Sequence, residues 1–486
     1  MNTSLAFPFD NTFARDMAAF GIPWQPAPAP APKLLHFDHA LAAELGLPVA
    51  AFDEAALAGI FSGNRLPEGA QPMAQAYAGH QFGGFSPRLG DGRALLVGEV
   101  VDALGRRRDL AFKGSGRTPF ARNGDGKAAV GPMLREVLVG EAMHALGVPT
   151  TRTLAVVATG SPVMRERPLP GAVLTRVAAS HLRVGTFEYF ASSGSEGQLE
   201  RIARYALARH DPALLDSGRP FLALLDAVAR RQASLVAQWM NLGFIHGVMN
   251  TDNMTISGET IDYGPCAFME AFDPGAVFSS IDQHGRYAYR NQPDIALWNL
   301  TRLAEALLPL IDPDPERAVA LATEVLNGFA DEYRARLLEG QRRKLGIEAG
   351  DDAADAALAG EWLGLLEANR VDFTLGWRRL ANAAEGEEAP LRQLFGEAAD
   401  LDEWLARWRA AGPSAALIRR TNPFVIPRNH LVEEALAAAS DEGDLTKMAS
   451  MLAAVRRPFD ESPAQERFAS PAPVEVTACY KTFCGT

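Results

Sequence analysis

The most constraining feature of the sequence is a change in its apolar pattern near residue 183. Before this point, short apolar runs alternate with glycine-rich turns. We expect strands at Arg93–Val101, Arg108–Phe112, Leu154–Ala158 and Ala172–Val177, and a helix at Pro132–Leu146. Beyond it, apolar residues recur at helical spacing over most of the chain. A strand-rich part joined to a larger helical part predicts an α+β fold with a ligand cleft between the two.

Several segments of the second part have the periodicity of helices. They are Gln198–His210, Pro220–Leu242, Trp298–Leu310, Pro315–Glu339, Ala354–Asn369, Ala398–Ala411, Leu431–Ser440 and Asp444–Val455. The glycine-rich stretch Gly243–Gly275 interrupts them, and Met254–Ile256 and Thr260–Ile261 within it are strand-like. Near the N-terminus, prolines alternate with alanine over residues 26–32, which predicts an extended stretch. A brief helix is expected at Leu41–Gly46.

Composition narrows the class of protein. The chain has 486 residues and a net charge of −12, so we expect no nucleic-acid binding and no attachment to anionic membranes. Its length allows about three domains. No apolar run reaches the ~18 residues of a membrane span, and we expect no secretory signal. Three cysteines are too few for a disulfide framework, so we expect a reducing, cytoplasmic compartment.

Two glycine turns could approach a phosphate. Gly90 and Gly92 precede an expected strand, where their backbone N–H groups could meet phosphate oxygens and Arg93 could add positive charge. Asp125 and Gly126 belong to a second such turn, before the expected helix. Taken singly, each motif is explained as well by an ordinary turn.

Lys113 follows an expected strand and precedes a Gly-Ser-Gly turn. A strand lysine paired with a helix carboxylate is how kinase-like proteins hold nucleotide phosphates, and the carboxylate here would be Glu136 or Glu141. The alternative is a surface lysine with two solvated glutamates. Arg176 and Arg183 could add guanidinium groups, which suit phosphate oxygens, although surface arginines are common.

The loop Phe244–Asn253, followed by Asp262-Tyr-Gly, is the most informative motif. Kinase-like folds use a His-bearing catalytic loop, a metal-binding Asn and a later Asp-aromatic-Gly whose Asp binds a second metal ion. Here Asn253 lies seven residues after His246, and Asp262 lies nine further on. Amide and carboxylate oxygens suit Mg²⁺ or Mn²⁺. His246 itself is interpreted as a buried, hydrogen-bonded side chain that shapes the loop.

One position departs from the kinase pattern. In small-molecule kinases with a His-Gly-Asp loop, the base lies two residues after the histidine, where this chain has Val248. The only acid in the loop is Asp252, beside Asn253. The nucleotide-binding residues are therefore present, while the usual base for phosphoryl transfer is missing or displaced.

The three cysteines form the last candidate feature. Cys266 follows the Asp-Tyr-Gly motif, and Cys479 and Cys484 lie near the C-terminus. They are either unrelated thiols or partners in a reversible bridge between Cys266 and one tail cysteine, which would lock the loop near the metal site.

Together these segments resemble the selenoprotein O family of kinase-fold protein adenylyltransferases. The resemblance extends from about Phe9 to the C-terminus and is most specific at residues 77–94, YAGHQFGGFSPRLGDGRA. Residues 113–120 (KGSGRTPF), 246–253 (HGVMNTDN), 262–265 (DYGP) and 428–430 (RNH) support it. Eukaryotic relatives carry selenocysteine near the C-terminus, where this chain has Cys484.

The resemblance implies a protein-kinase-like bilobal fold of the α+β class. It places an N-terminal extension at residues 1–75, a small β-rich N-lobe at 76–178, a larger helical C-lobe at 179–345, and a helical C-terminal extension with redox cysteines at 346–486. ATP would bind in reversed orientation, so that AMP passes to a Ser, Thr or Tyr hydroxyl of an acceptor protein. The family also allows UMP transfer with Mn²⁺, and we expect a monomer.

The resemblance also assigns individual residues. The nucleotide would be held by Gly90, Gly92, Arg93, Lys113, Asp125, Gly126, Glu136, Arg176, Arg183 and Asp262. Asn253 and Asp262 would hold Mg²⁺ or Mn²⁺, and Asp252 would accept the hydroxyl proton. Two alternatives are a phosphotransferase acting on a protein or small molecule, and an inactive nucleotide-binding pseudokinase scaffold. The retained Lys113, Asn253 and Asp262 argue against the scaffold.

Overall fold

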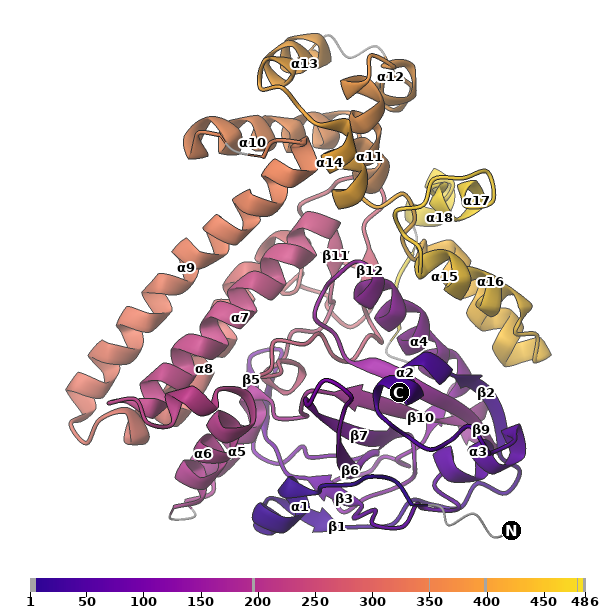
Figure 1. Ribbon diagram of the computed structural model, residues 1–486, viewed down its shortest axis with the longest axis vertical. Helices are drawn as coiled ribbons and strands as arrows, with labels where there is room; N and C mark the ends of the chain where they lie inside the picture. Colours follow the sequence, from indigo (N-terminus) through magenta and orange to yellow (C-terminus); the bar gives the residue numbers. More distant parts are fainter. Residues whose placement is uncertain (1–5, 195–196, 349, 397–399, 479, 484–486) are drawn as a thin grey trace.

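The structure, a computed structural model, describes residues 6–194, 197–348, 350–396, 400–478 and 480–483. The described residues form an antiparallel sheet of eight strands (Figure 1). The strand order is β1, β3, β6, β7, β10, β9, β2, and the short β8 pairs with β10. The strands are β1 (Gly21–Pro23), β2 (Lys33–Phe37), β3 (Met73–Gln75), β6 (Ala94–Val101), β7 (Arg107–Lys113), β8 (Ala128–Ala129), β9 (Arg152–Met164) and β10 (Pro168–Ala178).

The centre of the sheet is formed by strands that the sequence predicts. β6 and β7 carry the expected apolar runs on either side of a turn, and β9 and β10 extend beyond their expected bounds. The register of β10 against β7 pairs Leu174 with Lys113 and Arg176 with Ala111. Cross-strand partners and alternate residues share one face of a sheet, so Lys113 and Arg176 lie on the same face.

Helix α4 (Val130–Ala145) covers this face and begins slightly before the expected Pro132. Most of its residues are buried, because one side packs on β9 and β10 and the other on the C-terminal helices α15 and α16. Gly147 follows the helix end and has φ +79°. This left-handed conformation favours glycine at the end of a helix. The helix therefore presents polar side chains to a buried environment on two sides.

The N-terminal residues join the same sheet. The proline-rich stretch at residues 26–32 forms no helix or strand, and β2 directly after it pairs with β9 at the sheet edge. β1 and β3 form the opposite edge. Three short helices belong to this region: α1 (Thr12–Asp16), α2 (His39–Glu44) and α3 (Glu54–Phe61). The hairpin β4 (Gly79–Gln81) and β5 (Gly84–Ser86) is a separate two-stranded sheet.

Long helices form the middle of the molecule. In Figure 1, α7, α8 and α9 lie side by side, and their apolar residues share one core with α5 and α6. The bounds are α5 (Val184–Ser192), α6 (Gln198–His210), α7 (Pro220–Leu242), α8 (Gln292–Ile311) and α9 (Pro315–Leu345). The predicted bounds of α6 and α7 are confirmed, whereas α5 was not expected.

The remaining helices form two groups. In Figure 1, α10 to α14 lie at the top of the molecule, α15 and α16 lie beside α4, and α17 and α18 lie above α15. The first group packs around the buried tryptophans Trp362, Trp377, Trp404 and Trp408. The bounds are α10 (Asp352–Ala368), α11 (Phe373–Ala384), α12 (Ala389–Phe395), α13 (Asp400–Ala410), α14 (Ala415–Thr421), α15 (Asn429–Ala437), α16 (Thr446–Val455), α17 (Glu466–Ala469) and α18 (Val474–Ala478).

The glycine-rich interruption forms a loop region with one small strand pair. β11 (Phe244–Ile245) pairs with β12 (Ala267–Phe268). The expected strand-like pieces Met254–Ile256 and Thr260–Ile261 are not strands of a sheet. Each makes only a single bridge, because the chain reverses between them at Gly258, whose φ is +78°.

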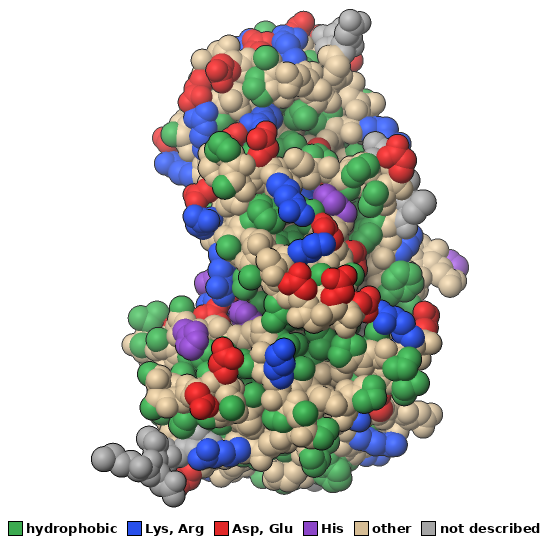
Figure 2. Space-filling model, turned by 90° about the vertical axis from the view of Figure 1, so that its right-hand side faces the viewer, with side chains coloured by type: hydrophobic (Ala, Val, Ile, Leu, Met, Phe, Trp, Pro, Cys, Tyr) green, Lys and Arg blue, Asp and Glu red, His purple; other side chains and the backbone are tan. Residues whose placement is uncertain are grey.

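The surface carries mixed charge. On the face shown in Figure 2, Lys and Arg side chains are interspersed with Asp and Glu. Among the described residues, no helix combines the length and apolar character needed to cross a bilayer.

Candidate functional site

Lys113, Glu136, Arg176 and Asp262 form a buried cluster between the sheet and the loop region. Lys113 Nζ donates to Glu136 Oε1 and to Asp262 Oδ1, the latter at 2.6 Å. Arg176 donates to Glu136 Oε2 at 2.9 Å and to Asp262 Oδ1 at 2.5 Å. The strand lysine is thus paired with a carboxylate of α4. The other candidate, Glu141, pairs instead with Arg152 on β9 at 2.8 Å.

The charges of this cluster are strongly coupled. Burial alone would raise the pKa of Asp262, but Arg176, Lys113 and Arg183 outweigh it and hold this pKa well below its ordinary value. Burial likewise opposes ionisation of Glu136, and Lys113 and Arg176 nevertheless lower its pKa. Both carboxylates are therefore ionised at neutral pH, and three cations face two anions. The third cation is Arg183, next to the cluster, and these five side chains together carry one more positive than negative charge, which suits a phosphate chain.

The backbone at Asp262 is strained. Its φ is +64°, a left-handed conformation that few residues other than glycine adopt. The contacts of its carboxylate with Lys113 and Arg176 hold this conformation. Such strain persists where the surroundings impose it, and it is concentrated at functional sites.

His246 orders the loop that leads to Asp252. Its Nε2 donates to Ile261 O at 2.9 Å, and its Nδ1 accepts from Val248 N at 3.4 Å. Burial lowers the pKa of His246, so the ring is neutral and ties the loop to the segment before Asp262. This agrees with the interpretation that His246 shapes the loop.

Asp252 is buried with an unused oxygen. Its Oδ1 has no hydrogen-bond partner among the described residues. Burial raises the pKa of Asp252 to about 6, and Arg183 opposes the shift. Gly79 of β4 lies so close that a Cβ there would be 2.6 Å from Oδ1, so only glycine fits at this position. A carboxylate of this kind can accept a proton near neutral pH.

Arg183 connects Asp252 with the buried cluster. Its guanidinium donates to the carbonyl oxygen of Asp252 at 2.8 Å and lies 3.8 Å from Asp262 Oδ2. It also stacks on the ring of Tyr77 at 4.5 Å. Arg183 is thereby fixed in position at the wall of the cavity beside Asp252.

All of the predicted site residues line two adjoining cavities. The first, of about 340 Å³, is lined by Lys113, Glu136, Arg176, Arg183, Asn253 and Asp262. The second, of about 630 Å³, is lined by Gly90, Asp125 and Gly126. Gly92, Arg93 and Asp252 line both. Residues that are far apart in the sequence therefore surround one continuous space, with Asp252 at the junction.

Asp125 lies apart from the buried cluster. Its carboxylate pairs with Arg165 at 2.9 Å on a half-exposed loop. Burial alone would raise the pKa of Asp125, but the hydrogen bonds and charges of Arg165 and Lys127 together outweigh it and lower this pKa. Gly126 has φ +69° and lies against the backbone of Gly116, where a Cβ would clash. The turn at residues 123–126 is thus a folded part of the second cavity rather than a partner of Lys113.

Asn253 and Asp262 fit a divalent cation. Asn253 Nδ2 donates to Val248 O at 3.0 Å, so the side-chain oxygen of Asn253 does not face that carbonyl. Asp262 Oδ1 accepts from Lys113 and Arg176, while Oδ2 has only the 3.8 Å contact with Arg183 and can take a further cation. In the described part of the chain, no three His, Cys, Asp or Glu side chains are grouped to hold a metal ion. An ion here would take its other ligands from phosphate and water, as Mg²⁺ commonly does.

Of the three cysteines in the bridge hypothesis, the structure describes Cys266. Cys266 is buried, and its thiol donates to Tyr263 O at 3.1 Å. Burial raises its pKa to about 11. Cys479 and Cys484 lie outside the described residues, so their pairing with Cys266 stays a prediction.

Sequence reasoning missed a network beside Asp252. Glu188 of α5 accepts from Thr251 Oγ1 at 2.5 Å and contacts His80 Nδ1. Thr251 Oγ1 in turn accepts from His80 N at 2.7 Å. His80 lies in residues 77–94, the stretch in which the family resemblance is most specific. A histidine between Gly79 and Gly83 in that stretch is the sequence feature that could have indicated this network.

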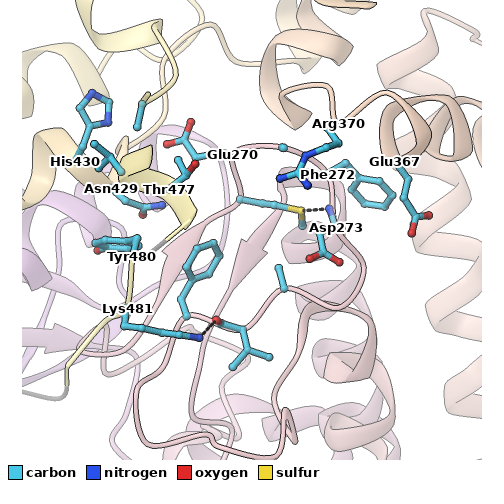
Figure 3. Close-up of a pocket in the computed structure, with 17 residues that line it drawn as sticks. Glu270, Phe272, Asp273, Glu367, Arg370, Asn429, His430, Thr477, Tyr480 and Lys481 are labelled. Atoms are coloured by element: carbon cyan, nitrogen blue, oxygen red, sulfur yellow. Dashed lines mark hydrogen bonds between the residues drawn. The ribbon is translucent and has the colours of Figure 1, made fainter. Parts of the chain in front are cut away.

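The Arg428-Asn-His segment holds the C-terminal helices against the loop region. Arg428 is completely buried and donates to Glu270 and Asp372, both at 2.6 Å. Figure 3 shows Glu270 and His430 among the side chains around a cavity of about 410 Å³ at this junction. This cavity shares no lining residue with the two cavities around Asp252.

Comparison with known proteins agrees with this geometry. Residues 4–456 match the family described as "Protein adenylyltransferase SelO". The chain belongs to the SelO family. It is 60% identical over 473 residues to a protein of Chromobacterium violaceum named protein nucleotidyltransferase YdiU, covering 96% of this chain and 99% of that one. Proteins of the same name are 59% identical in Cereibacter sphaeroides, over 99% of this chain and 100% of the relative, and 57% identical in a Mycobacterium species, over 98% and 99%.

Proposed function

We propose that this SelO-family protein transfers AMP from ATP to Ser, Thr or Tyr hydroxyls of proteins. The observation that carries the proposal is the continuous space in which three cations, two candidate metal ligands and a carboxyl with one unpartnered oxygen converge. Family membership supports the same activity, with ATP as the substrate.

We propose that the chain is divided as in protein kinases. Strands β6 to β10 and helix α4 would belong to the N-lobe at residues 76–178, and α5 to α9 would belong to the C-lobe at 179–345. Residues 1–75 and 346–486 would be extensions. The Lys113–Glu136 pair between strand and helix supports this assignment, because kinase N-lobes use the same pair.

The triphosphate would enter with its inner phosphate nearest the acceptor. Lys113, Arg176 and Arg183 would bind the outer phosphates, and Gly90, Gly92, Arg93, Asp125 and Gly126 would complete the nucleotide site. Val248 supports this orientation, since no base stands where a kinase would activate a hydroxyl for attack at the γ-phosphorus.

The reaction would be a direct displacement. The acceptor oxygen attacks the α-phosphorus and forms the new P–O bond, while the bond from the α-phosphorus to the bridging oxygen of pyrophosphate breaks. The hydroxyl proton passes to Asp252, whose raised pKa matches this role. Arg176, Arg183 and Lys113 stabilise the charge of the departing pyrophosphate.

Asn253 and Asp262 would hold Mg²⁺ or Mn²⁺. The bound ion would offset negative charge on the phosphate oxygens. UMP transfer from UTP with Mn²⁺ is a further activity that we propose for the same site, and a Cys266 bridge to a tail cysteine would regulate it.

Parallel assays with α-³²P-ATP and γ-³²P-ATP test the function. We expect protein labelling from the α-labelled nucleotide only. Labelling from the γ-labelled nucleotide would make the chain a phosphotransferase. No labelling from either nucleotide would make it an inactive scaffold.

A further inference from the structure

We propose that the β4–β5 hairpin and Ile281 form the docking surface for the acceptor polypeptide. The segment that binds there would be extended and would carry an apolar side chain near the hydroxyl that is modified. This inference rests on the proposed transfer of AMP to proteins and specifies which part of an acceptor the site recognises.

The hairpin is attached directly to the loop that carries Asp252. Phe82 N donates to Asn250 Oδ1 at 3.0 Å, and His80 N donates to Thr251 Oγ1 at 2.7 Å. Gly79 lies against the Asp252 carboxylate itself. A polypeptide that lies along the hairpin is therefore within reach of the group proposed to take its hydroxyl proton.

Three large apolar side chains are exposed at this point. The exposed fractions are 39% for Phe82, 45% for Phe85 and 51% for Ile281. Phe82 has φ +51°, a conformation that is unfavourable for a bulky residue and that surrounding contacts such as the hydrogen bond from Phe82 N to Asn250 must hold. Phe82 and Ile281 both line the cavity that contains Asp252, and Phe85 is exposed on the same hairpin as Phe82. Exposed apolar side chains beside a catalytic cavity mark a binding surface rather than a folding core.

A groove continues from the nucleotide cavity along this surface. It has a volume of about 630 Å³, and its walls include Phe82, Ile281, His284, Arg286 and Ile295. Phe82 and Ile281 also line the cavity that contains Asp252. A side chain next to the reacting hydroxyl would therefore enter a space that is continuous with the active site and has apolar walls.

The surface is held rigid from behind. Arg286 stacks on Trp298 at 4.8 Å and lies 3.6 Å from the position of a Cβ on Gly83, at the hairpin turn. His80 packs edge-on against Trp298 at 5.2 Å. Because this surface is already ordered, it loses little conformational entropy when a polypeptide docks. The entropy cost of binding then comes mainly from the acceptor segment, which favours docking of a flexible, extended polypeptide.

Synthetic peptides test this proposal. Parent peptides contain one Ser, Thr or Tyr as the only hydroxyl, flanked by Gly, Ala and Lys, and a series replaces one flanking residue at a time by Leu. With α-³²P-ATP, we expect Leu at one or two flanking positions to raise the kcat/KM of the wild-type protein roughly tenfold. Phe85→Ser and Ile281→Ser should each remove most of this preference.

The matched control is Val319→Ser, on α9, because Val319 is 49% exposed, close to the value for Ile281. This variant should keep the full preference. Phe85→Ser should also bind ATP with wild-type affinity, since Phe85 lines neither nucleotide cavity. A loss of the Leu preference with unchanged ATP affinity is the result that supports docking at the hairpin.

The opposite results separate the two proposals. If Leu has no effect on the wild-type protein, or if Phe85→Ser and Ile281→Ser keep the preference, the docking surface is wrong while AMP transfer stands. If no peptide is labelled but proteins in a lysate are, short extended segments are not recognised and the docking proposal fails alone. If neither peptides nor proteins are labelled, the proposed function fails.

Discussion

Glu136→Gln separates the catalytic role of the Lys113 pair from its contribution to stability. Glu136 is 4% exposed and accepts one hydrogen bond from Lys113 and one from Arg176. The amide keeps the shape of the side chain but removes its charge and places a donor where an acceptor is needed. Lys113 and Arg176 are then left to share Asp262.

The structure gives the size of each effect. Two charge-assisted hydrogen bonds contribute about 1.5–3 kcal/mol each, so we expect the free energy of unfolding to fall by about 3–6 kcal/mol. A shift of Lys113 toward Asp262 by about 1 Å would lower the transfer rate roughly 100-fold. ATP affinity should change less than about fivefold, because the lost positioning is offset by one fewer negative charge in the cavity.

Glu141→Gln is the matched control. Glu141 lies on the same helix, is 3% exposed, and accepts from Arg152 and Arg456 at 2.8 Å and 2.9 Å. This variant should lose about 2 kcal/mol of stability in urea unfolding. The loss is smaller because its arginine partners are more exposed than Lys113 and Arg176. It should keep the wild-type rate of label transfer from α-³²P-ATP. Equal transfer rates in the two variants would refute the catalytic assignment of Glu136.

Four further predictions concern the groups around the loop. Asp262→Ala should abolish transfer and the Mg²⁺-dependent part of the thermal shift with ATP; normal labelling would remove Asp262 from the metal site. Asp252→Asn should bind ATP but turn over at least roughly 100-fold more slowly, and a fully active variant would exclude Asp252 as the base. Asp252 must be ionised to accept a proton, and its pKa is about 6. The wild-type rate should therefore rise about tenfold from pH 5 to pH 7 and stay constant above it. The residual rate of Asp252→Asn should not follow this profile. Cys266, with a pKa of about 11, should react with iodoacetamide at pH 7.5 only after unfolding; fast native labelling would contradict its burial.

The parts of the fold that the sequence predicts are those where the apolar pattern follows one clear period. β6, β7, α6 and α7 are of this kind. Helix α8 begins at Gln292, earlier than the expected Trp298, because the buried Gln292 side chain bonds to Phe244 O and His246 N. Such a tertiary contact leaves no periodic signal in the sequence.

Other elements were missed for related reasons. α5 is short and mostly buried, so it shows little apolar periodicity. β2 follows the proline-rich stretch, and its partner β9 lies more than a hundred residues away. Short edge strands of this kind depend on a long-range pairing that the local sequence does not record.

The site residues could be named from motifs, but their partners could not. Glu136 and Glu141 are five residues apart and thus about 140° apart around α4. One must face Lys113 and the other must face away, and the sequence does not indicate which. The structure decides for Glu136, since the face of the sheet that carries Lys113 and Arg176 lies beneath it.

The central claim concerns the direction of the bound nucleotide, and a crystal structure with an ATP analogue that has a methylene between the α- and β-phosphorus tests it most directly. We expect the outer phosphates against Lys113, Arg176 and Arg183 and the α-phosphorus facing Asp252. A γ-phosphate next to Asp252, with the adenosine in the place of the outer phosphates, would contradict AMP transfer and favour a kinase.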